Sequence, residues 1–110
     1  MRLRGMLTPV EVTLLYFDGC PSWRLADERL AEALALTSHP DQPVTRRQVT
    51  TPEQAEQLGF RGSPTVLLDG RDPFPEPGAP TGLACRMYRT PDGLAGAPSV
   101  EQLVAALTAG

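Results

Sequence analysis

The chain contains no Lys, no Asn and no Ile, and it has only two Cys among its 110 residues. Two widely separated cysteines do not form the disulfide framework that holds many small secreted domains together. No apolar run approaches the length of a membrane span, so a membrane partner is not expected. The chain has 10 Arg and 13 acidic residues, so its net charge is −3. No basic stripe is present, which argues against nucleic acid as a partner.

The length and the apolar content of 41% predict a single folded domain over residues 1–110. Residues 1–8 are interpreted as a flexible N-terminal extension. Pro9 and Glu11 interrupt the first apolar stretch, and no small-residue cleavage site follows it, so we do not expect a secretory signal. We therefore expect a cytoplasmic protein, in which thiols are kept reduced.

Apolar periodicity and turn residues predict seven elements in an α/β order. Strands are expected over residues 10–17, 44–49, 65–70 and 83–89, and helices over 21–36, 52–58 and 100–107. Residues 71–83 are called the proline-rich insertion, and four prolines in residues 71–80 exclude a regular element there. A βαβ unit followed by a ββα unit predicts a four-stranded mixed sheet flanked by helices on both faces.

The segment Gly19-Cys20-Pro21-Ser22-Trp23 follows the first strand and opens the first helix. A helix N-terminus carries partial positive charge, which favours the thiolate form of a neighbouring cysteine. Cys20 is therefore the candidate catalytic thiol. Trp23 occupies the position that would complete a Cys-x-x-Cys pair, so this motif offers one reactive thiol and lacks its usual partner.

This element order, with Gly19-Cys20-Pro21 after the first strand and Ser63-Pro64-Thr65 opening the third, resembles the thioredoxin-like superfamily. The segment Gly96-Ala97-Pro98-Ser99 before the last helix also fits, and the resemblance covers Val10 to Leu107. It implies that Pro64 follows a cis peptide bond and faces Cys20. It also implies that the backbone of Ser63 pairs with an extended thiol substrate as an added strand.

Two further side chains are candidate substrate-binding residues. Trp23 is interpreted as a hydrophobic cover that limits access of water to Cys20. Arg61 lies beside the Ser63-Pro64 motif and has the charge to hold an anionic substrate, such as the carboxylates of glutathione, although a solvated arginine is the ordinary interpretation. Arg86 has the same charge, and a solvated arginine is its ordinary interpretation as well. The single His39 lies in a loop far along the chain from Cys20, so a catalytic Cys–His pair is not expected.

Cys85 is the second candidate catalytic residue, as a resolving thiol, and two arrangements are open. If residues 83–89 form the fourth strand of a simple hairpin, Cys85 lies at the end far from Cys20. If Gly93-Leu94-Ala95 forms the last strand instead, Cys85 belongs to the proline-rich insertion and can fold over Cys20. We favour the first arrangement, because a simple hairpin needs no special folding of the insertion.

The leading hypothesis is a thioredoxin-like thiol oxidoreductase or thiol-exchange protein. Its partner would be a thiol or disulfide substrate, either a protein or a glutathione-like molecule. One alternative is a soft-metal thiol protein similar to organomercurial lyases, which would use Cys20, Cys85 and Asp18. The other is a non-catalytic binding module of the same fold. No cofactor is expected, and no Cys/His cluster has the spacing of metal ligands.

Overall fold

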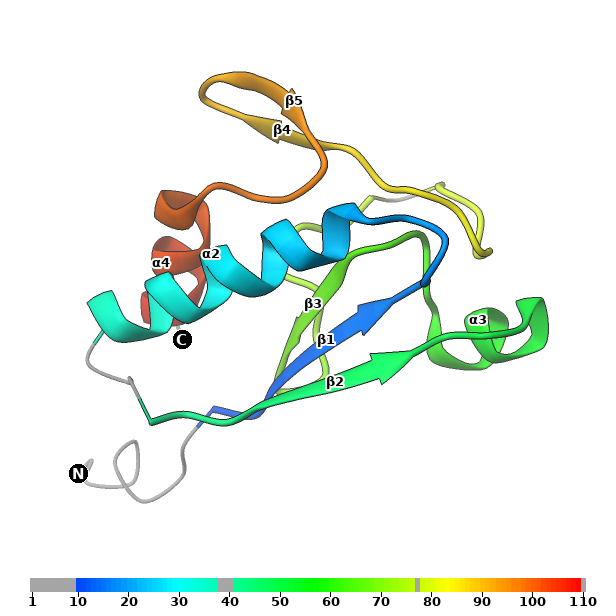
Figure 1. Ribbon diagram of the computed structural model, residues 1–110, viewed down its shortest axis with the longest axis horizontal. Helices are drawn as coiled ribbons and strands as arrows, with labels where there is room; N and C mark the ends of the chain where they lie inside the picture. The colour runs from blue at the N-terminus through cyan, green and yellow to red at the C-terminus, as the bar shows by residue number, and fades with distance from the viewer. Residues whose placement is uncertain (1–9, 38–40, 77, 110) are drawn as a thin grey trace.

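A three-stranded mixed sheet forms the centre of the molecule (Figure 1). In the computed structural model, residues 10–37, 41–76 and 78–109 are described, so the expected extension at residues 1–8 and His39 lie outside them. Strand β1 (Val12–Tyr16) lies in the middle. It pairs in parallel with β2 (Val44–Gln48) and in the antiparallel sense with β3 (Thr65–Leu68).

The two faces of the sheet are covered by different helices. Leu14 of β1 belongs to a buried cluster with residues of α2 (Ser22–Leu36) and α4 (Val100–Ala109). The next residue, Leu15, faces the other way and packs with Ala55 of α3 (Pro52–Leu58) and with Phe60. This alternation follows from the strand period of two.

Local hydrogen bonds and backbone conformation fix both ends of α3 and the start of α4. The hydroxyl of Thr51 accepts a hydrogen bond from the backbone N–H of Gln54, and α3 ends at Gly59 in the left-handed conformation. Ser99 and Gln102 exchange two side-chain hydrogen bonds with each other's backbone N–H groups before α4. This reciprocal pair is a capping box, which fixes the point at which the last helix begins.

The predicted four-stranded sheet is wrong. Strands β4 (Tyr88–Thr90) and β5 (Gly93–Ala95) form a separate antiparallel pair and do not join the main sheet. After β3, only Arg71 bridges back to Leu68 before the chain reaches Pro73 and Pro75. Because proline lacks a backbone N–H, this segment cannot continue an antiparallel ladder along β3. The predicted strand over residues 83–89 does not pair with β3 either, because residues 84–86 pair with Ser63, before β3 begins, and β4 pairs with β5. Among the described residues, no helix is long and apolar enough to cross a membrane.

Candidate functional site

A disulfide bond joins Cys20 and Cys85, whose Cα atoms are 5.7 Å apart. Cys20 follows β1 and directly precedes Pro21, the N-cap residue of α2. No side chain caps this helix, so its first N–H groups receive no side-chain acceptor. Cys85 lies between β3 and β4, in the segment that follows the proline-rich insertion. The structure thus brings together the two predicted catalytic residues, in the arrangement that we did not favour.

The segment around Cys85 is docked on Ser63 by backbone hydrogen bonds. The N–H of Ser63 donates to the carbonyl of Ala84 at 2.7 Å, and the N–H of Arg86 donates to the carbonyl of Ser63 at 2.9 Å. Ser63 and Cys85 therefore form an isolated parallel β-bridge. Both backbone groups that were expected to pair with a substrate strand are occupied by the chain's own residues.

Gly62 permits this close approach. Its φ is +125°, a conformation that residues with side chains rarely adopt. A Cβ atom at this position would lie 2.8 Å from the Cβ of Arg86 and 3.4 Å from the carbonyl oxygen of Ala84. The absence of a side chain at Gly62 thus permits the backbone turn and leaves room for residues 84–86 to pair with Ser63.

The Ser63–Pro64 peptide bond is cis, as the family resemblance implied. Ser63 is fully buried, and its carbonyl oxygen lies 3.7 Å from the Sγ of Cys20. A disulfide sulfur carries no proton, so this contact becomes a hydrogen bond only when the bond is reduced and the thiol is protonated. The carbonyl of Pro64 accepts a hydrogen bond from the hydroxyl of Tyr88. The residues on either side of the cis bond thus contact Cys20 and the strand that follows Cys85.

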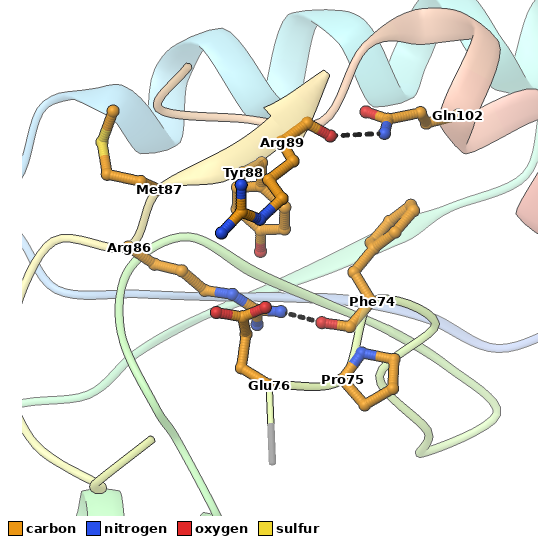
Figure 2. Close-up of a pocket in the computed structure, with 8 residues that line it drawn as sticks. All are labelled: Phe74, Pro75, Glu76, Arg86, Met87, Tyr88, Arg89 and Gln102. Atoms are coloured by element: carbon orange, nitrogen blue, oxygen red, sulfur yellow. Dashed lines mark hydrogen bonds between the residues drawn. The ribbon is translucent and has the colours of Figure 1, made fainter. Parts of the chain in front are cut away.

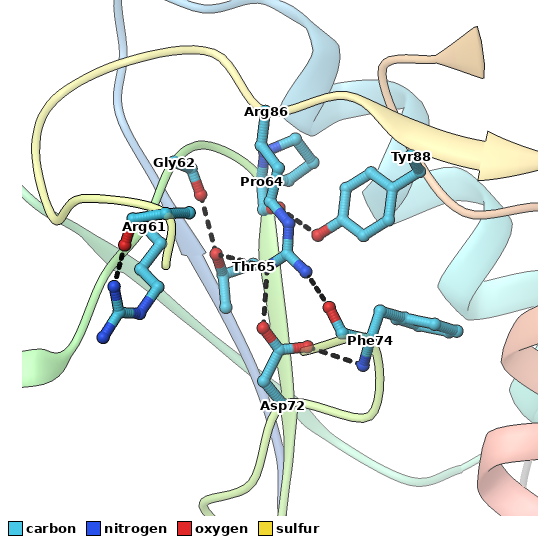
Figure 3. Close-up of polar contacts among 9 residues, drawn as sticks. Arg61, Gly62, Pro64, Thr65, Asp72, Phe74, Arg86 and Tyr88 are labelled. Carbon is cyan, nitrogen blue, oxygen red and sulfur yellow. Dashed lines mark hydrogen bonds and ion pairs between the residues drawn. The ribbon is translucent and has the colours of Figure 1, made fainter. Parts of the chain in front are cut away.

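A buried arginine next to Cys85 anchors the segment (Figure 3). Only 4% of the Arg86 side chain is exposed, and its Nη1 lies 2.7 Å from Oδ2 of Asp72. The guanidinium also donates to the carbonyl of Phe74 and lies over the ring of Tyr88, 4.5 Å from its centroid. Burial raises the pKa of Tyr88, against the opposing effect of the Arg86 charge. These contacts hold both ends of the insertion against the start of β3.

The two cysteines differ in their access to solvent. Cys20 is 2% exposed, whereas Cys85 is an exposed residue. From Cys85 onward, exposed and buried residues alternate: Met87 is exposed, whereas Arg86 and Tyr88 are buried. The segment therefore presents Cys85 and Met87 outward while Arg86 and Tyr88 face the protein.

Trp23 and Arg61 make contacts within the chain. Trp23 stacks on Tyr16, with ring centroids 4.3 Å apart, and packs against the core cluster of α2 and α4. Trp23 is therefore a residue of α2 that packs against the end of β1. Arg61 donates a hydrogen bond to the carbonyl of Ala79, so it ties the insertion to the residues before β3 (Figure 3).

Sequence reasoning missed Asp72 and Tyr88 and treated Arg86 as a solvated arginine. The signal that was available is the period-two pattern of residues 85–88, which places Arg86 and Tyr88 on one side and Cys85 on the other. The partner of Arg86 carried no local signal, because Asp72 lies 14 positions away, beyond the prolines of the insertion.

A small cavity of about 130 Å³ lies beside this anchor (Figure 2). Its lining comes from the insertion, from the residues after Cys85 and from α4, and includes Phe74, Glu76, Met87, Arg89 and Gln102.

Across the part of the chain that the structure describes, no group of three or more His, Cys, Asp or Glu side chains is placed to hold a metal ion. Asp18 is exposed in the loop before Cys20.

Comparisons with protein-family models, with curated proteins and with solved structures gave no match to this chain. The case for a function therefore rests on the site itself.

Proposed function

We propose that the protein is a thioredoxin-like thiol–disulfide oxidoreductase that cycles between the Cys20–Cys85 disulfide and the corresponding dithiol. The observation that carries the proposal is that Cys20, at the start of α2, is paired with Cys85, which is distant in the sequence. Backbone hydrogen bonds that do not involve the disulfide dock the segment that contains Cys85. Cys20 beside the cis Ser63–Pro64 bond supports the superfamily assignment. In a cytoplasm, where thiols are kept reduced, the resting form would be the dithiol and would reduce a substrate disulfide.

The geometry favours rapid closure of the disulfide. The hydrogen bonds of Ser63 to residues 84–86 and the Arg86–Asp72 ion pair do not involve either sulfur. They are available to hold Cys85 beside Cys20 after reduction, so the second thiol acts at a high effective concentration. The chemistry is balanced by an external pair: the protein disulfide and two thiols become the protein dithiol and one disulfide.

An exchange assay tests this function. Purified protein would be added in small amounts to glutathione and a fluorescence-quenched peptide disulfide, and the rate of peptide release would be measured. We expect the wild-type rate to exceed the rates of the Cys20→Ser and Cys85→Ser variants by at least about ten-fold. Variant Met87→Leu, which changes an exposed neighbour without removing a thiol, is the control and should keep the wild-type rate. Equal rates for all four proteins would contradict the proposal.

A soft-metal thiol protein is the second candidate, and the same pairing supports it. Two thiolates whose Cα atoms lie 5.7 Å apart are close enough to ligate one soft ion such as Hg²⁺. Titration of the reduced protein with Hg²⁺, followed by the thiolate-to-metal absorption band, would show one ion per protein chain. Retention of that band in the Cys85→Ser variant at equal affinity would exclude paired ligation.

A further inference from the structure

The disulfide is accessible from one side only. Cys20 is 2% exposed and its sulfur lies against the carbonyl of Ser63, whereas Cys85 is exposed on the outer side of its segment. In Figure 1 this segment, drawn in yellow before β4, passes over the point at which the chain leaves β1 and enters α2. Of the two bonded cysteines, Cys85 is therefore the residue that solvent reaches.

Thiol–disulfide exchange requires a specific direction of approach. The attacking thiolate, the attacked sulfur and the leaving sulfur lie close to one line, and access decides which sulfur is attacked. Attack on the sulfur of Cys20 would have to come from the side opposite Cys85, through buried protein. Attack on the sulfur of Cys85 comes from the side opposite Cys20, where the segment faces solvent.

We infer that external thiols exchange at Cys85 and that Cys20 is the leaving and resolving thiolate, an assignment that rests on the proposed function. An external thiolate forms a bond to the sulfur of Cys85, and the Cys20–Cys85 bond breaks. The electron pair of that bond stays on Cys20, which becomes a thiolate beside the uncapped N-terminus of α2. A second external thiolate then releases Cys85 by attacking the external sulfur and forming the external disulfide.

The reverse direction uses the same intermediate. In the reduced protein, the thiolate of Cys85 attacks a substrate disulfide and expels one substrate thiolate. The thiolate of Cys20 then attacks the sulfur of Cys85, closes the protein disulfide and releases the other substrate thiolate. The roles expected from the motif are therefore exchanged: the thiol at the helix start resolves, and the distant exposed thiol carries the substrate.

The docking of residues 84–86 narrows the class of substrate. Both backbone groups of Ser63 are bonded to Ala84 and Arg86, so a peptide strand cannot add there while the segment is docked. Substrate must reach Cys85 without β-strand pairing to Ser63. Of the two partners expected, this favours the glutathione-like molecule over an extended protein chain.

The test uses the oxidised wild-type protein and glutathione. The reaction is stopped at short times with excess N-ethylmaleimide and digested with trypsin. The peptide containing Cys20 ends at Arg24 and the peptide containing Cys85 ends at Arg86, so mass spectrometry separates the two sites. We expect the earliest mixed disulfide on Cys85, with N-ethylmaleimide on Cys20, in at least about ten-fold excess over the reverse product.

Two variants provide a second measurement. After reduction and exposure to glutathione disulfide, the Cys20→Ser protein should accumulate a stable adduct on Cys85, because no thiol remains to resolve it. The Cys85→Ser protein should form its adduct on Cys20 more slowly. An early wild-type adduct on Cys20, or equal amounts on both cysteines, would overturn the assignment and leave the proposed function standing. No adduct and no reduction at all would overturn both.

Discussion

The guanidinium of Arg86 is 2.7 Å from the carboxylate of Asp72, and this partly buried pair fixes the residue that follows Cys85. The pair connects the insertion to the segment that carries the second cysteine.

Replacing Arg86 tests this connection. The Arg86→Met variant removes the ion pair with Asp72 and the buried contacts of the guanidinium with Phe74 and Tyr88, and we expect the free energy of unfolding to fall by roughly 3 kcal/mol. Arg46→Met is the matched control, because it breaks the Arg46–Asp27 pair, in which the arginine side chain is 51% exposed. That loss should be at most about 1 kcal/mol. Urea unfolding of both variants gives the comparison, and equal losses would contradict an anchoring role.

The close approach at Gly62 gives a second prediction. In the Gly62→Ala variant the new methyl group meets the Cβ of Arg86, so residues 84–86 must move away from Ser63. We expect slower closure of the Cys20–Cys85 disulfide after reduction, and a loss of stability larger by about 1 kcal/mol or more than in the control. Gly70→Ala is that control: φ there is +81°, but nothing lies within 4 Å of an added Cβ.

Closure is measured by stopped alkylation at increasing times under a fixed glutathione disulfide concentration. Gly70→Ala shares the cost of a positive φ without the clash, so it should close at the wild-type rate. If both variants close at that rate, the docking of residues 84–86 does not align the thiols.

Tyr88 predicts a dependence of stability on alkaline pH. Its pKa is raised by burial above the ordinary value of about 10.0, so the folded protein holds this proton more tightly than the unfolded chain does. The resulting stabilisation is complete below pH 10 and is lost as the pH rises through the higher folded value. The limiting slope is about 1.4 kcal/mol per pH unit.

Tyr88→Phe should remove this part of the alkaline decline. The variant should also lose roughly 1 kcal/mol at neutral pH, because the carbonyl of Pro64 no longer receives the hydroxyl. The Tyr16→Phe variant keeps Tyr88 and should decline as the wild type does. An unchanged slope in Tyr88→Phe would show that Tyr88 ionises as easily in the folded state as in the unfolded chain.

Reduction of the disulfide should lower stability. The bond closes a loop with a sequence separation of 65 residues. On the chain-entropy model, a loop of this length contributes about 4 kcal/mol to the free energy of unfolding. Urea unfolding with and without a phosphine reductant measures the difference. The Cys85→Ser variant has no bond to lose, so an equal effect of the reductant on that variant would assign the change to another cause.

Local signals predicted much of the fold. The apolar run before Cys20 and the helical periodicity of residues 21–36 and 100–107 act over a few residues, so the sequence shows them directly. The fourth strand was wrong, because residues 84–86 of the predicted segment pair with Ser63 and Tyr88–Thr90 pair with β5, and both pairings depend on distant partners.

The site could be predicted only in part. Cys20 at a helix start and the cis bond before Pro64 followed from motifs and from the family resemblance. The position of Cys85 did not, because it depends on Arg86 reaching Asp72 and on Gly62 leaving room for the segment. Both are long-range contacts, and neither residue type indicates its partner.

If Cys20 and Cys85 act as one reversible two-thiol pair, they should be oxidised and reduced together. A redox titration measures this, with the dilute wild-type protein in a series of glutathione and glutathione disulfide buffers, followed by acid quench, alkylation and intact mass. We expect a single transition from a doubly alkylated monomer to an unalkylated monomer that has lost two hydrogens. Exclusive formation of glutathione adducts or Cys20-linked dimers, with Cys85 still alkylated, would contradict it.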